Sequence, residues 1–360
     1  MLPKPRPVLT QMSDVVHGAL DFTELEHLGL QPDEVLDFSV NGNPYGPSPQ
    51  VREAIVRVPL ECYPDRESLA LRRALASHLE VAPEGIMAGN GSVELLWLTA
   101  LAFVRPGDTV LIVGPTFGEY ARAAVLMGAQ AHCWTARPEG GFKVNPEEVM
   151  QTLQRLRPRL VFVCNPNNPT GTLLAVEAIA AWANALPRTL FVMDEAYLPF
   201  AAGAPSILTM PAANILVLRS MTKAHALAGM RLGFAIGHPV IIHALATVCP
   251  PWNVNALAQA AGLAALADQT HLTQSLAQLA HAKTVLVQSL QALDLALVPS
   301  ATHFFLIKVK DATILRRALL QHGILVRDCA SFGLPEYIRV ATRRPEENAR
   351  LLAALKKAQS

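Results

Sequence analysis

The chain has 360 residues, of which 51% are hydrophobic and 16% charged, and its formal net charge is +1. This length and composition predict a folded protein with two domains and exclude a disordered chain. The near-neutral charge, without long basic or acidic runs, gives no support for a nucleic-acid partner or a charged membrane surface. No apolar run reaches the ~18 residues of a membrane span, so no membrane contact is expected.

The cysteines are five in number and lack any Cys-x-x-Cys spacing. An odd, unpatterned set argues against both a disulfide framework and a zinc site, and no other metal site is expected. The N-terminus has no apolar segment typical of a secretory signal. Together these features predict a cytoplasmic protein with reduced, buried thiols.

Short apolar runs alternate with helical patterns through the first two thirds of the chain. A helix is expected near Leu20 to Leu28, within an N-terminal arm. The strands are expected at Thr109–Val113, Leu160–Val163, Thr189–Met193, Ile215–Leu218 and Leu232–Ile236. The intervening helices are expected near Val93–Phe103, Phe117–Met127, Pro146–Leu156 and Leu173–Leu186. This alternation predicts an α/β fold with a mostly parallel sheet and helices on both faces.

The composition changes in the last third of the chain. Val254 to Leu293 is rich in alanine and leucine and predicts one long connecting helix. Beyond it, shorter elements predict a smaller α+β domain: strands His303–Val309 and Tyr337–Ala341, and helices Asp311–Gln321 and Pro345–Lys357. The predicted division is residues 1–47 as the arm and part of the small domain, 48–250 as the large domain and 251–360 as the C-terminal small domain.

Two helix starts carry candidate binding residues. Gly89 to Glu94 opens a helix with small residues, so the backbone at Asn90, Gly91 and Ser92 can bind an anion. A serine and a glutamate at a helix start are also a common capping arrangement, and that reading stays open. Phe117 is expected to begin the next helix, where it would either stack on a flat ring or pack in the core.

Three further motifs follow strands, and ligands bind at the carboxyl ends of strands in such sheets. Asn165 to Gly171 contains two prolines and a glycine, which predict a rigid turn that directs Asn168 to this edge. The next strand ends in Asp194-Glu-Ala-Tyr197. A buried acid there needs a partner, and a protonated pyridine nitrogen would suit it, unless the pair is simply solvated. Asn168 and Tyr197 can both donate to a phenolic oxygen.

The third motif follows the strand at Ile215. It brings together Ser220, Thr222, Lys223 and Arg231, which are hydroxyl and cationic groups suited to a phosphate. A lysine held among cations and away from water has a lowered pKa and can act as an amine nucleophile. The alternative is an ordinary surface loop with a solvated lysine.

The order of these motifs resembles the fold-type I pyridoxal-phosphate enzymes of the aminotransferase class I/II family, over nearly the whole chain. The resemblance implies that pyridoxal 5'-phosphate is bonded to Lys223, with Asp194 on the ring nitrogen, Asn168 and Tyr197 on the ring oxygen and Phe117 stacked on the ring. Lys223, Asp194 and Tyr197 are the expected catalytic residues. The resemblance places the phosphate on Gly91, Ser92, Ser220 and Arg231, with Asn90 and Thr222 as further cofactor-binding residues.

Tyr63, in Cys62-Tyr-Pro-Asp65, resembles a tyrosine that reaches the cofactor phosphate of the neighbouring subunit in relatives. This resemblance implies a homodimer with shared active sites.

Within the family, the stretches Asp37–Pro47 and Pro345–Asn348 are similar to both histidinol-phosphate aminotransferase and threonine-phosphate decarboxylase. Three features favour the decarboxylase: His17-Gly18, although Ala19 replaces a second glycine, the stretch Val326–Pro335, and Arg219–Lys223. His17 can equally be a solvated residue of the arm.

The substrate is expected to carry an anion at each end. Arg339 matches the arginine that binds an α-carboxylate, and Arg327 is the expected ligand of a distal phosphate, aided by His17 and Asn41. The favoured activity is therefore decarboxylation of L-threonine O-3-phosphate to aminopropanol phosphate for cobalamin biosynthesis. The alternatives are a transaminase acting on histidinol phosphate or another amino acid, and a non-enzymatic ligand-binding protein. The same residues serve both reactions, because the cofactor supplies the chemistry.

Overall fold

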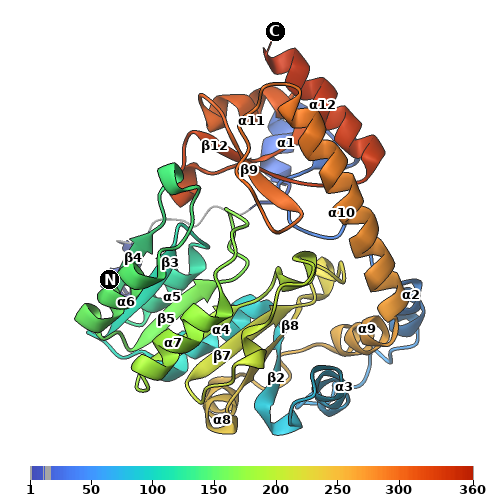
Figure 1. Cartoon of the computed structure of the whole chain (residues 1–360). Helices are drawn as coiled ribbons and strands as arrows, with labels where there is room; N and C mark the ends of the chain where they lie inside the picture. The colour runs from blue at the N-terminus through green and yellow to red at the C-terminus, as the bar shows by residue number, and fades with distance from the viewer. Residues whose placement is uncertain (1, 11, 13–17, 360) are drawn as a thin grey trace.

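The computed structural model describes residues 2–10, 12 and 18–359. Its larger part is built on a seven-stranded sheet with the strand order β2-β8-β7-β6-β5-β3-β4 (Figure 1). Strand β8 alone runs against its neighbours β2 and β7, so the predicted mostly parallel sheet is confirmed. The strands are β2 (Ile86–Asn90), β3 (Thr109–Gly114), β4 (Gln130–Thr135), β5 (Leu160–Cys164), β6 (Leu190–Asp194), β7 (Ile215–Ser220) and β8 (Leu232–Gly237).

Helices cover both faces of this sheet. Successive residues of a strand point to opposite faces, so each strand contributes side chains to both layers. Leu111 and Val113 of β3 belong to one hydrophobic cluster, whereas Val110 and Ile112 belong to another. The first cluster includes α3 (Leu69–Leu79), α6 (Pro146–Leu156), α7 (Val176–Ala185) and α9 (Ala256–Ala267). The second includes α4 (Gly91–Phe103), α5 (Glu119–Leu126) and α8 (Pro239–Val248). The expected α/β architecture with two helical layers is thus confirmed.

Two strands of the sheet were not expected from the sequence. Strand β4 lies at the edge and its six residues are all exposed or only partly buried, so it lacks an apolar run. Strand β2 ends in Ala-Gly-Asn, which are poor strand formers. The helix expected from Phe117 in fact begins at Glu119.

The smaller part of the molecule contains a three-stranded antiparallel sheet in the order β11-β12-β9. These strands are β9 (Phe304–Lys308), β11 (Arg327–Asp328) and β12 (Tyr337–Ala341). The N-terminal segment joins this part, since β1 (Leu36–Asp37) pairs in parallel with β10 (Ile324–Leu325). The helices here are α1 (Phe22–Leu28), α11 (Ala312–Leu320) and α12 (Pro345–Gln359). The domain limits at 47/48 and 250/251 stay a prediction.

The single connecting helix expected from Val254 to Leu293 is wrong. Two helices occupy this stretch, α9 and α10 (Gln269–Gln291), and the chain breaks at Asp268. The Asp268 side chain accepts from His271 N at 3.1 Å and so caps the start of α10, while Ser48 Oγ donates to its other oxygen at 2.5 Å. Helix α10 then runs along one side of the molecule from the large sheet to the smaller part (Figure 1). The remaining helix, α2 (Pro49–Val56), packs on α9.

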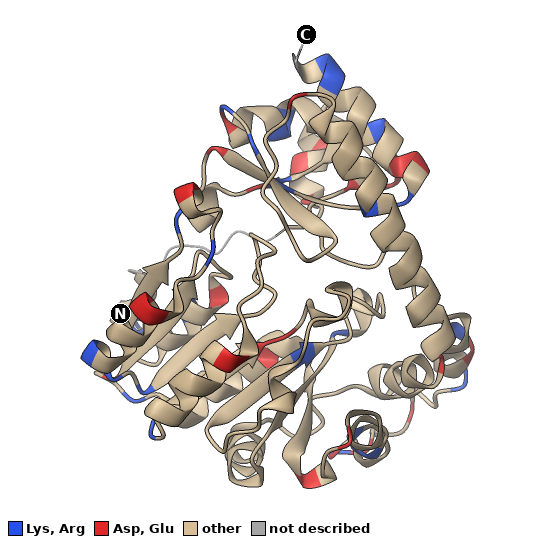
Figure 2. Ribbon diagram, in the orientation of Figure 1, with Lys and Arg blue, Asp and Glu red and all other residues tan. Residues whose placement is uncertain are grey.

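Charged residues of both signs are interspersed along the ribbon (Figure 2). Among the described residues, no helix is both long and apolar enough to cross a membrane. Within the same residues, no group of three histidine, cysteine or acidic side chains is placed to hold a metal ion. All five cysteines are free, but Cys62 and Cys133 are exposed rather than buried as expected.

Candidate active site

The parallel strands β5, β6 and β7 end at the same edge of the large sheet, and three sequence motifs follow them there. A cavity of about 440 Å³ lies at this edge, between the large sheet and the smaller part. Its lining includes eight of the residues singled out in the sequence: Asn41, Phe117, Asn168, Tyr197, Lys223, Arg231, Arg327 and Arg339.

Lys223 extends into this cavity from the loop after β7. The loop is fixed by Asn43, whose backbone N–H donates to Lys223 O at 3.0 Å and whose Nδ2 donates to Ala224 O at 3.0 Å. Asn43 Nδ2 also donates to Ser275 Oγ of α10 at 2.8 Å, and sequence reasoning did not single Asn43 out. Burial, with Arg339 and Arg231 nearby, lowers the pKa of Lys223 to about 8. Part of the Lys223 population is therefore neutral amine near neutral pH, as a nucleophile or base requires.

Asp194 ends β6 beneath this lysine and is 8% exposed. Its Oδ2 accepts from Tyr120 Oη at 2.7 Å, and its Oδ1 accepts from Ala196 N at 3.0 Å. Burial raises the pKa of Asp194, because the carboxylate anion is costly away from water. A cationic partner would stabilise this anion. Tyr120 was missed in the sequence, because its role depends on a contact with a residue 74 positions further along the chain.

A cradle for a phosphate lies at the start of α4. Gly91 has φ +79°, and a Cβ there would stand 2.8 Å from Arg231 Nη2. A Cβ on Gly233 would stand 2.4 Å from Ser92 N, so only glycine lets β8 approach the helix start this closely. Ser220 Oγ and Thr222 Oγ1 lie 2.6 Å apart on the adjoining loop. The helix N-terminus, two hydroxyls and a guanidinium are groups suited to an anion, and their role as phosphate ligands stays a prediction.

The turn after β5 presents Asn168 to the cavity. Asn165 stabilises this turn through two hydrogen bonds to Leu174. Its Nδ2 donates to Leu174 O and its Oδ1 accepts from Leu174 N, each at 2.9 Å. Asn168 Oδ1 accepts from Arg339 Nη1, so its Nδ2 is left to donate to a ligand. Tyr197 is buried, and burial raises its pKa to about 12, so its hydroxyl stays a protonated donor at neutral pH.

Two arginines of the smaller part face each other across β11 and β12, where Arg327 and Arg339 are directly opposite. They are 6% and 5% exposed, and burial lowers the pKa of each. Arg327 Nη2 donates to Ser331 Oγ at 2.6 Å, and Arg339 Nη2 donates to Ser39 O. Arg339 Nε and both amide atoms of Asn41 are buried without a hydrogen-bond partner in the described part of the chain. Buried guanidinium groups suit an anionic ligand.

The predicted residue Tyr63 is not part of the cavity lining in the described chain. Tyr63 is 81% exposed and stacks on Trp252, with ring centroids 4.7 Å apart. His17 lies outside the described residues. The neighbouring Ala19 adopts φ +135°, a backbone conformation that favours glycine, where the similar decarboxylase motif has its second glycine.

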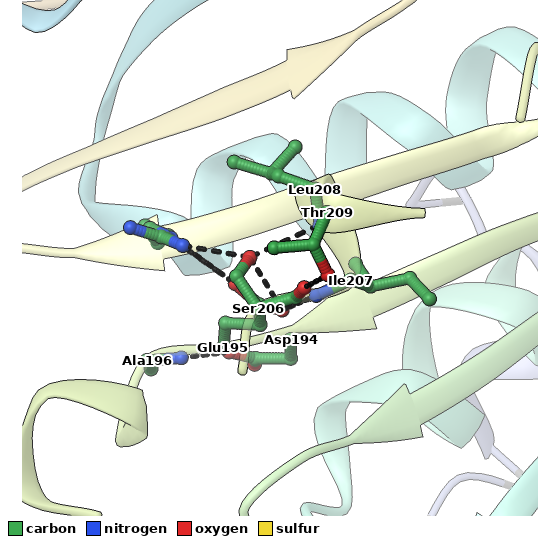
Figure 3. Close-up of polar contacts among 8 residues, drawn as sticks. Asp194, Glu195, Ala196, Ser206, Ile207, Leu208 and Thr209 are labelled. Atoms are coloured by element: carbon green, nitrogen blue, oxygen red, sulfur yellow. Dashed lines mark hydrogen bonds and ion pairs between the residues drawn. The ribbon is translucent and has the colours of Figure 1, made fainter. Parts of the chain in front are cut away.

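Behind the site, Glu195 is buried rather than solvated and contacts Ser206 and Ile207 (Figure 3). Glu195 also forms an ion pair with Arg219. Arg219 Nη2 donates to Glu195 Oε2 at 2.9 Å and to Ser206 Oγ at 2.8 Å. Glu195 also accepts from Ser206 Oγ and from Ile207 N, the latter at 2.8 Å. This network ties together the ends of β6 and β7, which carry Asp194 and the lysine loop.

Replacing Glu195 with alanine is expected to lower the free energy of unfolding by about 3 kcal/mol, because it leaves the partly buried Arg219 charge and the Ile207 N–H without their buried partner. Glu336→Ala is the matched control. It breaks a 4.0 Å pair with Lys308 in which both side chains are more than half exposed, and should cost about 0–1 kcal/mol. Urea unfolding measures both; equal losses would contradict the role of the buried network.

The donor set fits pyridoxal phosphate. A lysine with a lowered pKa, two donors for a ring oxygen and the cradle residue Arg231 line one cavity. The buried carboxylate of Asp194 lies close enough to this lysine to influence its pKa. Phe117 lines the same cavity and can cover a flat ring.

Comparison with known proteins supports this fit. The protein-family model described as "Aminotransferase class I and II" matches residues 33–355. A histidinol-phosphate aminotransferase from Symbiobacterium thermophilum is 36% identical over 98% of both chains. The structure of histidinol-phosphate aminotransferase from Sinorhizobium meliloti in complex with pyridoxal-5'-phosphate has a TM-score of 0.88 and 26% identity, and the match covers 99% of this chain and 98% of that one. L-threonine-O-3-phosphate decarboxylase from Porphyromonas gingivalis has a TM-score of 0.78 at 26% identity, over 89% of this chain and 98% of that one.

The favoured activity, decarboxylation of threonine phosphate for cobalamin biosynthesis, is wrong. Relatives that are 34–38% identical to this chain are named histidinol-phosphate aminotransferase. The error has a physical origin, because the motifs that favoured the decarboxylase position anions and do not choose which bond breaks.

The resemblance to both subfamilies and the fold-type I architecture are confirmed. The chain belongs to the aminotransferase class I and II family, and its cofactor is pyridoxal phosphate.

Proposed function

We propose that this chain is an aminotransferase that moves an amino group between histidinol phosphate, or a closely similar phosphorylated amine, and a 2-oxo acid. The structural observation that supports an anionic substrate is the buried pair Arg327 and Arg339 in the cavity that holds Lys223. The names of the relatives at 34–38% identity support the choice of substrate.

A pair of arginines suits a reaction in which two different anions use one site in turn. Histidinol phosphate carries a phosphate and no carboxylate, whereas glutamate and 2-oxoglutarate carry two carboxylates. Guanidinium groups bind both kinds of anion through paired N–H donors. The partnerless Nε of Arg339 is one donor that such an anion would satisfy.

Bound pyridoxal phosphate supplies an electron sink for the bonds at the substrate carbon that bears the amine. The chain positions and moves the protons. Lys223 Nζ, neutral in part at its pKa of about 8, takes the proton from that carbon and later returns one. Asp194 keeps an anionic oxygen against the ring nitrogen, and Tyr120 holds that carboxylate in place. Asn168 and Tyr197 orient the ring through its oxygen.

The purified protein, loaded with cofactor, should form glutamate from 2-oxoglutarate when L-histidinol phosphate is added. Glutamate formation with unphosphorylated histidinol should be much slower. Absence of glutamate formation from histidinol phosphate would refute the proposal, as would carbon dioxide release from threonine phosphate at a comparable rate.

The two arginines are expected to differ in which substrates they serve. Arg327→Ala should lower kcat/KM for histidinol phosphate by roughly thirtyfold to several hundredfold, since a lost charge-assisted pair is worth about 2–4 kcal/mol. Arg339→Ala should weaken the binding of both histidinol phosphate and glutamate. Steady-state kinetics on both substrates measure this. Arg105→Ala, an exposed arginine outside the cavity, is the control; unchanged kinetics in Arg327→Ala would remove that residue from the site.

The proposal includes a homodimer in which Tyr63 serves the neighbouring subunit. Its support is the 81% exposure of Tyr63, which leaves the side chain open to a second copy. Tyr63→Ala and Lys223→Ala should each be nearly inactive. Co-expressed, they should recover about a quarter of wild-type activity, because half of the random dimers are mixed and each mixed dimer has one intact site. No recovery, or a monomeric enzyme with full activity, would contradict shared sites.

A further inference from the structure

The reach of Lys223 into the cavity depends on the backbone that carries it. Its side chain is a long flexible stem, so the place of Nζ is only as fixed as the Cα from which it extends. Within the loop, Lys223 O accepts from Ala226 N at 3.1 Å, and Ala226 adopts φ +54°, a conformation unfavourable for a residue with a Cβ. A strained residue of this kind persists only where its surroundings hold it, so contacts from outside the loop are needed.

Asn43 supplies such contacts to both peptide groups that follow Lys223. Its backbone N–H donates to Lys223 O at 3.0 Å, and its Nδ2 donates to Ala224 O at 3.0 Å. Because one residue holds two successive carbonyls, it fixes the direction of the chain immediately after the lysine. Asn43 is 5% exposed and is not among the described residues that line the cavity, so it acts on the lysine loop and not on a ligand.

The amide of Asn43 is itself held on two sides. Its Oδ1 accepts from Tyr45 N at 3.1 Å, and its Nδ2 also donates to Ser275 Oγ of α10 at 2.8 Å. Ser275 is 4% exposed, and its hydroxyl donates to Leu272 O at 3.0 Å, so its oxygen serves Asn43 as an acceptor. Both Nδ2 protons of Asn43 are thereby used. Helix α10 therefore sets the orientation of the Asn43 amide.

The chain that follows Asn43 contacts α10 at two more points. His271 Nε2 lies 3.0 Å from Gly46 O, and Ser48 Oγ donates to Asp268 Oδ2 at 2.5 Å. Residues 43–48 thus lie against the first turns of α10, the helix that runs from the large sheet to the smaller part (Figure 1). The lysine loop is therefore held by α10, through Asn43, as well as by the strand that precedes it.

We propose that Asn43 is a positioning residue for proton transfer by Lys223, and that Ser275 orients Asn43 for this role. The inference rests on the proposed function, in which Lys223 Nζ takes the proton from the substrate carbon that bears the amine. Such a transfer needs the nitrogen within about 3 Å of its target, and a misplacement of about 1 Å can lower the rate by about 10²-fold. The inference extends that function by naming the contact that holds the base in place.

A role in folding alone predicts something different. If Asn43 only stabilises the fold, its loss lowers the free energy of unfolding and leaves the folded enzyme unchanged. If Asn43 positions Lys223, its loss changes the folded enzyme in two ways. Proton removal from the substrate slows, and the visible circular dichroism of the bound cofactor changes, because this signal depends on how the lysine holds the cofactor.

The test follows single turnovers of the cofactor-loaded enzyme with L-histidinol phosphate that carries hydrogen or deuterium at the carbon bearing the amine. The isotope-sensitive rate reports proton removal, and its dependence on substrate concentration gives the dissociation constant. We expect Asn43→Ala to lower this rate by about tenfold to hundredfold and to change the dissociation constant less than about twofold. The visible circular dichroism of this variant should differ from that of wild type.

Ser275→Ala tests the orientation of Asn43 in a variant that keeps both donors to the lysine loop. It should lower the isotope-sensitive rate by about threefold to tenfold. The double variant should lose no more than Asn43→Ala alone, because Ser275 acts through Asn43.

Asn214→Ala is the matched control. Asn214 Nδ2 also donates to backbone carbonyls, three of them at 3.0–3.1 Å, at the end of α7 and just before β6. It is not among the described residues that line the cavity. Its loss should destabilise the fold and leave both the isotope-sensitive rate and the circular dichroism as in wild type.

The outcomes are distinguishable. An isotope-sensitive rate in Asn43→Ala within about twofold of wild type would overturn the role of Asn43, as would an equal loss in Asn214→Ala. If Asn43→Ala does not fold, wild-type behaviour of Ser275→Ala would overturn the inference. A wild-type enzyme that does not turn over histidinol phosphate would refute the proposed function, and the circular dichroism of the variants would still test whether Asn43 positions Lys223.

Discussion

Replacing Lys223 with alanine is expected to lower kcat for transamination by at least about 10³-fold, because the variant loses the amine that we propose holds the cofactor and moves the substrate proton. The lowered pKa of about 8 and the position in the cavity set this lysine apart. Steady-state kinetics give the loss in rate. Borohydride treatment of wild type, followed by peptide mapping, should find the cofactor on the peptide that contains Lys223.

Lys283 supplies the matched control. Burial lowers its pKa too, but it does not line the cavity, and its Nζ donates to Ser300 O at 2.5 Å. Lys283→Gln keeps a donor for that carbonyl and should retain kcat within a few fold. A Lys223→Ala enzyme with more than a tenth of wild-type activity, or cofactor fixed on another lysine, would refute the assignment.

Replacing Asp194 with asparagine or alanine is expected to lower kcat by roughly 10²-fold or more, because the ring nitrogen loses its anionic partner and the cofactor becomes a weaker electron sink. Asparagine preserves the volume and can still accept from Tyr120, so it isolates the charge from the packing. The rate of transamination and the visible absorbance of the bound cofactor should both be recorded. Activity within a few fold of wild type in Asp194→Asn would show that the carboxylate is only structural.

Strand and helix positions in the large part of the molecule were largely predictable, because its strands are buried on both faces and read as continuous apolar runs. The edge strand β4 was not, since its residues are mostly exposed. The break at Asp268 was also hidden. The alanine- and leucine-rich pattern continues on both sides of it, and no glycine or proline marks the cap.

The site residues that follow strands were predictable for the same topological reason, as the carboxyl ends of parallel strands share one edge. Tyr120 and Asn43 were not. Each acts through a contact between segments far apart in the chain: Tyr120 with Asp194, and Asn43 with the lysine loop. Such contacts leave no local pattern in the sequence.

The choice between decarboxylation and amino transfer could not be made from these motifs. Both reactions use a lysine, a ring-nitrogen partner and anion-binding arginines, and the bond that breaks depends on how the substrate is turned relative to the cofactor ring. Arg327 and Arg339 are proposed to bind an anion, and an anion at that place is compatible with either orientation.

The central claim is that the amino group itself moves from the phosphorylated amine to the oxo acid. L-histidinol phosphate labelled with ¹⁵N at its amino group, incubated with the cofactor-loaded enzyme and unlabelled 2-oxoglutarate, tests it directly by mass spectrometry of the products. The account predicts ¹⁵N-glutamate in an amount equal to the histidinol phosphate consumed, with no carbon dioxide released. Consumption of histidinol phosphate without labelled glutamate, or no consumption at all, would contradict it.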